Sequence, residues 1–166
     1  MSQEDKEKDY FESPIHLEYQ YTAGAATTRF LNKVKEGKLV GQECPKCKAV
    51  YVPPRGSCPR DGIATNKEVE LVDQGCIESF TIVHIPIPGN PIVPPYVCAM
   101  IRLDGANISF LHLVDGIKLT DIRIGMRVKA VWKPKSEWRH SLENIKWFIP
   151  TDEPDVDVSK LRFQAE

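Results

Sequence analysis

The chain has 166 residues, of which 42% are hydrophobic and 27% are charged, and its formal net charge is -1. This composition excludes a wholly disordered chain and fits one larger domain or two small modules. The near-neutral balance argues against a protein that only coats nucleic acid, and no apolar run approaches the roughly 18 residues of a membrane helix.

The N-terminal region, residues 1–37, is expected to be a tail followed by one helix. Residues 1–14 are polar and acidic, and they match neither a secretory signal nor an Arg-rich transit peptide, so we expect a cytoplasmic protein without a membrane partner. From about Thr22 to Gly37, apolar residues recur at roughly helical spacing, and Gly37 is placed to end the helix. We expect this amphipathic helix to dock on the rest of the chain; the alternative is that its apolar face meets a partner.

Residues 38–67 are short of large aliphatic side chains and rich in Cys, Pro and Gly. A stretch this small cannot build an ordinary core and needs a staple. It contains Cys44-Pro-Lys-Cys47, then ten residues, then Cys58-Pro-Arg-Asp61. Three of the five cysteines fall here, which in a reducing compartment indicates a metal rather than disulfides.

Two knuckles with two-residue gaps can bring four ligands to one tetrahedral ion. Aspartate is a permitted zinc ligand, so the spacing predicts a structural zinc ribbon held by Cys44, Cys47, Cys58 and Asp61. Such a site is closed and holds the fold without catalysing a reaction. Two alternatives stay open, namely Asp61 as a turn residue and a site that has lost its metal, and the ligand set also admits iron. The site with three thiolates and Asp61 ranks above the metal-free site, and recruitment of the distant Cys76 ranks below these two.

Residues 68–150 contain about five runs of β-branched and aromatic residues with partial alternation, which indicates a small OB-type barrel. Asp104-Gly105 predicts a tight turn between two of these strands. Five prolines between residues 86 and 95 make a stiff loop, which is either a rigid connection or a preorganised contact surface. Residues 151–166 are an acidic tail, expected to be extended or mobile unless its apolar residues are pinned against a surface. The predicted fold class is mainly β: a helix, a small rubredoxin-like zinc ribbon and a five-stranded OB-fold barrel.

Signals for catalysis are few. The four histidines form no acid–base or nucleophile motif, and there is no phosphate-binding Gly-rich loop, HExxH or GxSxG. His112 is expected to be a hydrogen-bonded sheet residue. Cys76 and Cys98 are expected to be small buried side chains. A self-contained acyl-transfer enzyme using either thiol is therefore the weakest hypothesis, and we expect no catalytic residues.

The run from Phe30 to Gly62 resembles the start of the zinc-ribbon/OB-fold proteins encoded beside thiolases, long labelled only as a domain of unknown function. The matching features are Gly37–Gln42 before the first knuckle, Val52–Arg55 between the knuckles, and the barrel layout with its proline-rich loop and Ile124–Val128. The resemblance covers roughly residues 25–150. Asp61 departs from it, because the family pattern has a cysteine there.

This resemblance implies a non-catalytic accessory subunit that binds acyl-CoA, a thiolase or related acyl-CoA enzyme, or both. Coenzyme A presents phosphates and adenine at one end and an apolar acyl chain at the other. Basic and aromatic residues interleave near the last strands, so the candidate ligand contacts are Trp132, Lys133, Lys135, Trp138 and Arg139. These charges are alternatively a solvated strand end. The alternative function is a single-stranded nucleic-acid-binding module, in which the same aromatic residues would stack on bases.

Overall fold

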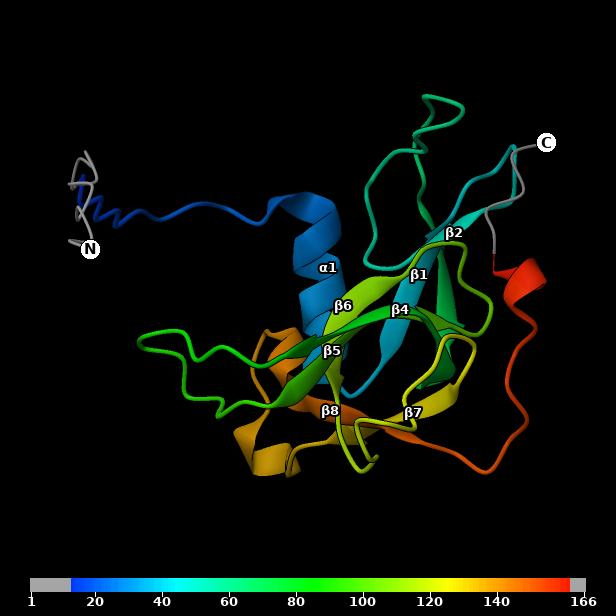
Figure 1. Cartoon of the computed structure of the whole chain (residues 1–166). Coiled ribbons are helices and arrows are strands. Elements are labelled where there is room, and N and C mark those ends of the chain that lie inside the picture. Colours follow the sequence, from blue (N-terminus) through cyan, green and yellow to red (C-terminus); the bar gives the residue numbers. More distant parts are fainter. Residues whose placement is uncertain (1–12, 162–166) are drawn as a thin grey trace, which may run out of the picture.

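The computed structural model describes residues 13–161, so the predictions made for residues 1–12 and 162–166 lie outside the described residues. One helix precedes a three-stranded sheet and a closed five-stranded barrel (Figure 1). The predicted fold class is confirmed. No helix within residues 13–161 combines the length and the apolar character needed to span a bilayer.

Helix α1 runs from Gly24 to Lys35, two residues shorter at each end than predicted. It docks on the body as expected, because Phe30 and Val34 are buried in the same core as the barrel strands. The buried Asn144 ties the end of the helix to the barrel by donating a hydrogen bond to the carbonyl of Val34 at 3.3 Å. Gly37 follows with a φ of 79°, and a side chain there would overlap the ring of Trp138.

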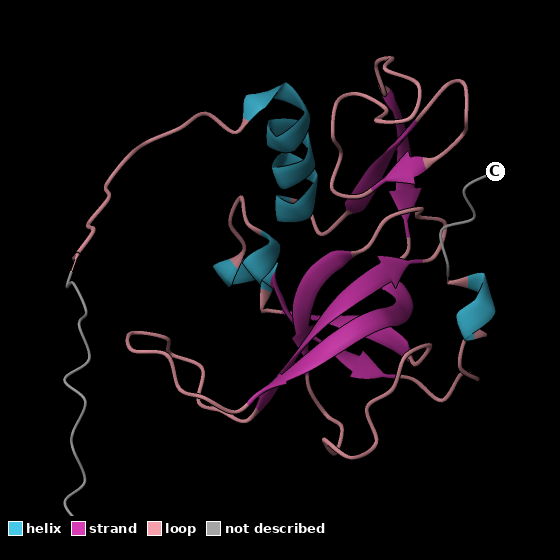
Figure 2. Cartoon of the chain, turned by 45° about the horizontal axis from the view of Figure 1, so that its top comes forward, coloured by secondary structure: helices cyan, strands magenta, loops and turns pink. Residues whose placement is uncertain are grey.

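The small sheet contains β1 (Leu39–Glu43), β2 (Val50–Tyr51) and β3 (Lys67–Leu71) in the order β2-β1-β3, all antiparallel. Figure 2 shows it beside α1 at one end of the barrel. The apolar run that begins at residue 68 divides, since β3 pairs with β1 over five positions and the barrel begins only at residue 74. The division of the chain at residues 37, 67 and 150 remains a prediction.

The barrel contains β4 (Gln74–Val83), β5 (Tyr96–Leu103), β6 (Phe110–Val114), β7 (Arg127–Trp132) and β8 (Ile145–Pro150). Its order is β4-β5-β6-β8-β7, and pairing of β4 with β7 closes it. Burial alternates strictly along β5, as expected for a strand with one face in the core. The parallel contact of β6 with β8 is short, with Val114 opposite Phe148 as its register pair.

The connections carry three 3-10 turns and two features predicted from the sequence. The turns are η1 (Lys135–Glu137), η2 (Leu142–Asn144) and η3 (Val158–Lys160). Asp104-Gly105 does form a tight turn, in which the amide of Ala106 donates to the carbonyl of Leu103 at 3.0 Å. The proline-rich loop between β4 and β5 projects from the barrel (Figure 1), and it exposes Ile85, Ile87 and Val93.

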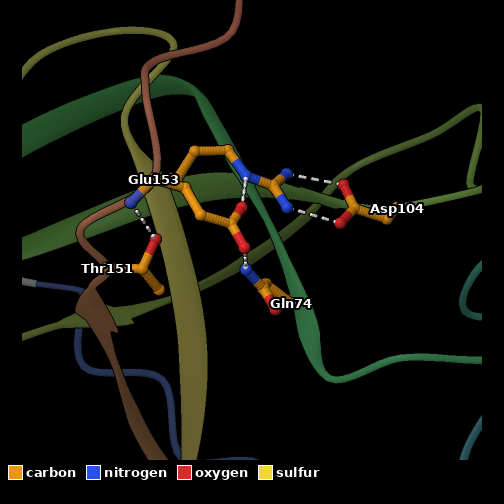
Figure 3. Close-up of polar contacts among 5 residues, drawn as sticks. Gln74, Asp104, Thr151 and Glu153 are labelled. Carbon is orange, nitrogen blue, oxygen red and sulfur yellow. Dashed lines mark hydrogen bonds and ion pairs between the residues drawn. The ribbon is translucent and has the colours of Figure 1, made fainter.

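The described part of the C-terminal tail is pinned to the barrel, which was the alternative to a mobile tail. Arg127 forms a two-pronged ion pair with Asp104, at 2.6 Å for each bond, and it also donates to Glu153 at 2.8 Å. The side-chain amide of Gln74 donates to the other carboxylate oxygen of Glu153 at 2.6 Å (Figure 3). The hydrogen bond from Arg127 holds the pKa of Glu153 below its ordinary value. Two residues before Arg127, a side chain at Gly125 would overlap the tail backbone.

Candidate metal centre

The two knuckles adopt the same backbone hydrogen-bond pattern. In the first, the amide of Lys48 donates to the carbonyl of Cys44 at 3.0 Å, and the amide of Cys44 donates to Ala49 at 2.9 Å. In the second, the amide of Gly62 donates to the carbonyl of Cys58 at 2.9 Å, and the amide of Cys58 donates to the carbonyl five residues later. The two knuckles are therefore local copies of each other.

Because the two knuckles have the same backbone pattern, Asp61 occupies in the second knuckle the position that Cys47 occupies in the first. It lies three residues after Cys58, as Cys47 lies three residues after Cys44, and the following residue is left-handed in both knuckles. That residue is Gly62 (φ 66°) in one knuckle and Lys48 (φ 63°) in the other. Left-handed backbone is far easier for glycine than for a residue with a side chain, so the first knuckle is strained at one position.

The four predicted ligands converge. Cys44, Cys47, Cys58 and Asp61 offer ligand atoms that all lie within 4.8 Å of one another. The sulfurs of Cys47 and Cys58 are 3.6 Å apart, and the Asp61 Oδ2 lies 3.2 Å from Cys44 and 3.4 Å from Cys58. A tetrahedral zinc ion with bonds of about 2.3 Å to sulfur and about 2.1 Å to oxygen requires sulfur–sulfur and sulfur–oxygen separations of about 3.8 and about 3.6 Å. The donor set therefore fits a zinc ion.

Asp61 supplies the negative charge of the metal-free cluster. Hydrogen bonds from the thiols of Cys47 and Cys44 hold the pKa of Asp61 well below its usual range, and the same bond to Asp61 raises the pKa of Cys47 to about 11. The other carboxylate oxygen, Oδ1, faces the ammonium of Lys46 at 3.3 Å. A metal must therefore displace protons from sulfur, while the carboxylate is already in its ligating form.

Tyr51 is a member of this site that sequence reasoning missed. Its hydroxyl lies 3.2 Å from the sulfur of Cys58, and the side chain is buried. Burial alone would raise the pKa of Cys58, but hydrogen bonds from Tyr51 and from backbone amides hold it below its ordinary value. Such outer partners orient metal ligands. No spacing rule links a strand tyrosine to a cysteine seven residues later, so only the fold exposes this contact.

The predicted ligand-contact residues are partly brought together. Lys133, Trp138 and Arg139 line one pocket of about 310 Å³, beside η1 and η2, whereas Trp132 and Lys135 are not among its lining residues. Both indole N–H groups are engaged inside the protein, that of Trp132 with Asp73 at 2.9 Å and that of Trp138 with the carbonyl of Lys133 at 2.8 Å. The assignment of these five residues to a ligand stays a prediction.

Two larger pockets continue one after the other from this one, and sequence reasoning missed both. A pocket of about 560 Å³ lies between β6, η2 and β8, and it shares Lys133 with the first pocket. A pocket of about 540 Å³ continues from it under the proline-rich loop, sharing Ile92, Leu113 and Lys146. Trp147 lines the far pocket. The three pockets form a row from a charged end, lined by Lys133 and Arg139 together with Glu137 and Glu143, to a largely apolar end.

The middle pocket also contains a cysteine and a histidine, without the features of a nucleophile and its base. Burial raises the pKa of Cys98 and lowers the pKa of His112. The His112 Nδ1 accepts the backbone N–H of Leu113 at 2.9 Å, which leaves the ring oriented by the backbone rather than by the thiol. Cys76 is buried, and burial raises its pKa as well. Neither thiol is activated as a nucleophile requires.

Two family models match this chain, one over the zinc ribbon and one over the barrel. Residues 32–66 match the model described as the ChsH2 rubredoxin-like zinc ribbon domain, and residues 68–133 match the ChsH2 C-terminal OB-fold domain. Two solved structures are similar. A Sulfolobus solfataricus protein of unknown function from the DUF35 family has a TM-score of 0.55 and 26% identity, over 65% of this chain and 78% of that one. The Ltp2-ChsH2(DUF35) aldolase has a TM-score of 0.61 and 26% identity, over 79% and 98%.

Curated relatives give the same family. A DUF35 domain-containing scaffold protein of Methanocaldococcus jannaschii is 36% identical over 97 residues, which cover 57% of this chain and 67% of the relative. A second protein of that name, from Methanothermobacter thermautotrophicus, is 30% identical over 103 residues, or 60% and 74%. A probable enoyl-CoA hydratase alpha subunit of Thermomonospora curvata is 35% identical over 98 residues, or 59% of this chain but only 30% of that protein.

Proposed function

The chain belongs to the DUF35 family of zinc-ribbon and OB-fold proteins, and on that premise we propose that it is a non-catalytic accessory subunit. It would bind a thiolase or related acyl-CoA enzyme, and it would bind the acyl-CoA that the enzyme uses. Relatives named as scaffold proteins, as an enoyl-CoA hydratase subunit and as part of an aldolase complex support this class of partner.

The observation that carries the proposal is the row of three pockets that begins beside basic side chains and ends under an exposed apolar loop. Lys133 and Arg139 at the first pocket would meet the phosphates of coenzyme A. The middle and far pockets, bounded by Leu142, Ile145 and Ile92, would receive the pantetheine and acyl parts. A ligand with one anionic end and one apolar end matches this order.

The partner enzyme would meet the proline-rich loop. Ile85, Ile87 and Val93 are exposed there, and exposed apolar groups gathered in one place mark interaction sites. Proline limits the conformations of the free loop, so less entropy is lost when it binds. The zinc ribbon would act by holding the fold, because its four ligands leave no open position for a substrate.

Titration of the purified protein with acyl-CoA tests the ligand assignment. Trp147 lines the far pocket, so an acyl-CoA with a long chain should change the tryptophan fluorescence in a saturable way. Free coenzyme A should bind at least tenfold more weakly, since it lacks the apolar end. Replacing Arg139→Gln should weaken both ligands, whereas Arg60→Gln on the zinc ribbon is the matched control. An affinity that is equal for both ligands, or that is unchanged in R139Q, contradicts the assignment.

A single-stranded nucleic acid is the second candidate, because Lys133, Arg139 and the aromatic Trp138 line the first pocket. Its binding should weaken steeply with salt, with a slope set by the number of phosphates contacted. Binding to a mostly apolar enzyme surface should respond to salt far less.

A further inference from the structure

Residues 15–21 form an extended segment in which apolar and polar side chains alternate. Ile15, Leu17, Tyr19 and Tyr21 are 79%, 74%, 75% and 81% exposed, and within residues 13–161 no strand pairs with this segment. Figures 1 and 2 both show it leaving the body before α1. Alternation with a period of two is typical of a strand with one buried face. Four large apolar side chains on one face indicate that the segment is completed by a sheet edge.

Although the barrel is closed, residues 110–113 of β6 have no register partner on β8 and offer such an edge. This strand pairs with β5 at five positions, but its register with β8 is the single pair of Val114 and Phe148. The backbone N–H of Leu113 donates to the ring of His112 at 2.9 Å. The pocket of about 560 Å³ opens beside this edge, and Leu111 is 61% exposed at its wall.

The distribution of charged residues along the sequence indicates which partner covers the β6 edge. Residues 1–18 contain six carboxylates and two lysines, whereas residues 121–147 contain seven Lys or Arg and three carboxylates. The basic stretch includes Lys133 and Lys146 at the pocket, together with one acidic lining residue, Glu143. The acidic segment and the basic edge belong to the same sequence, so a second copy of this chain supplies a surface of complementary charge.

We propose that two copies of the chain exchange residues 15–21, each segment docking as a strand on the β6 edge of the other copy. The apolar side chains enter the pocket between β6 and β8, which Lys133 and Lys146 also line. Gly24, with a φ of 74° and open space around its Cα, is the point where the segment leaves α1. The exchange is reciprocal, so it closes at two copies.

This inference does not depend on the proposed function. The docked strand occupies the middle pocket of the row, so where both hold, acyl-CoA shifts the dimer towards monomers. Self-association without any effect of acyl-CoA keeps the dimer and removes the ligand assignment. Acyl-CoA binding to a chain that is always monomeric keeps the ligand assignment and removes the dimer.

Sedimentation equilibrium of the full zinc-loaded chain tests the exchange. We expect a monomer–dimer equilibrium, with dissociation at least tenfold stronger in the double variant Leu17→Ser/Tyr19→Ser. The matched control, His16→Ser/Gln20→Ser, changes the opposite face of the same segment and should dimerise as the parent does. On the receiving side, the exposed Leu111→Lys should also dissociate the dimer, with circular dichroism confirming that the variant is folded.

Mixing the two defective variants separates donor from acceptor. A pair made of L17S/Y19S and L111K retains one intact contact, so a mixed dimer should form more strongly than either variant alone. A parent chain that stays monomeric up to about 100 μM overturns the proposal, whether or not the segment docks on its own β6. So does a dimer that is insensitive to L17S/Y19S or to L111K.

Discussion

Replacement of Asp61 tests whether this carboxylate is the fourth zinc ligand. Cys44 and Cys58 are 0% and 1% exposed, and the second hydrophobic cluster around them contains only Ala49 and Tyr51 as further buried members. So small a cluster cannot hold the ribbon without its metal. Removing an outer partner of a ligand already costs about 10–100-fold in metal affinity, so removing a ligand by Asp61→Ala should cost at least about 100-fold.

Because zinc binds only the folded protein, weaker zinc binding lowers the free energy of unfolding. With free zinc above the dissociation constant in both proteins, a 100-fold weaker site lowers the free energy of unfolding by about 2.7 kcal/mol. For a chain of this size that corresponds to a fall in Tm of about 5–11 °C. Scanning calorimetry at a buffered zinc concentration, together with chelator competition, measures both quantities.

Three companion variants of the zinc site sharpen this test. Asp61→Cys completes a four-thiolate site and should retain zinc at least as well as the parent. Asp61→Asn keeps the size of the side chain but loses its charge, so it should fall between the parent and D61A. Lys46→Ala removes only the pairing at Oδ1 and should be nearly neutral. Zinc affinity and Tm that are unchanged in D61A would refute the assignment of Asp61 and leave it as a turn residue.

Three further predictions concern the backbone, the pH response and the C-terminal tail. Lys48→Gly should raise the free energy of unfolding by about 1 kcal/mol in denaturant titrations, because it relieves the strain of a left-handed backbone. Gly62→Ala should lower it by a similar amount. Effects of the same sign in the two variants would contradict the equivalence of the knuckles. Burial lowers the pKa of His112 below its unfolded value of about 6.5, so its contribution is complete above that pH and is lost progressively as the pH falls below it. His112→Gln should therefore flatten the dependence of stability on pH below about 6.5, whereas an unchanged slope in this variant would contradict the reasoning. Arg127→Met should destabilise the fold by about 2 kcal/mol, because it leaves the half-exposed carboxylates of Asp104 and Glu153 without their ion pair. It should also speed hydrogen exchange in residues 151–158. Unchanged exchange would show that the tail is held independently of Arg127.

Local signals in the sequence were sufficient for the elements that depend on them. The two knuckles and the Asp104-Gly105 turn each rest on a few adjacent residues, and the structure contains both. The helix was predicted two residues too long at each end, because Ala23 provides no side-chain cap to mark its start. The five-stranded barrel followed from β-branched runs, even though the first run contributes β3 to the other sheet.

The remaining features depend on contacts between distant residues. Tyr51 reaches Cys58 only because β2 folds over the knuckles, and the middle pocket exists because β6 and η2 face each other. The pinned tail depends on Arg127 meeting Asp104 and Glu153, which are 23 and 26 residues away. Periodicity and spacing carry no information on such pairs, so the sequence could offer only the alternative of a pinned tail.

The most direct test of the accessory-subunit account is the set of proteins that co-purify with this chain from its native source at moderate salt, identified by mass spectrometry. The account predicts near-stoichiometric recovery of a thiolase or related acyl-CoA enzyme, and loss of that enzyme when Ile87 and Val93 of the exposed loop are replaced by Asp. Recovery of nucleic-acid-binding machinery without any such enzyme would contradict it.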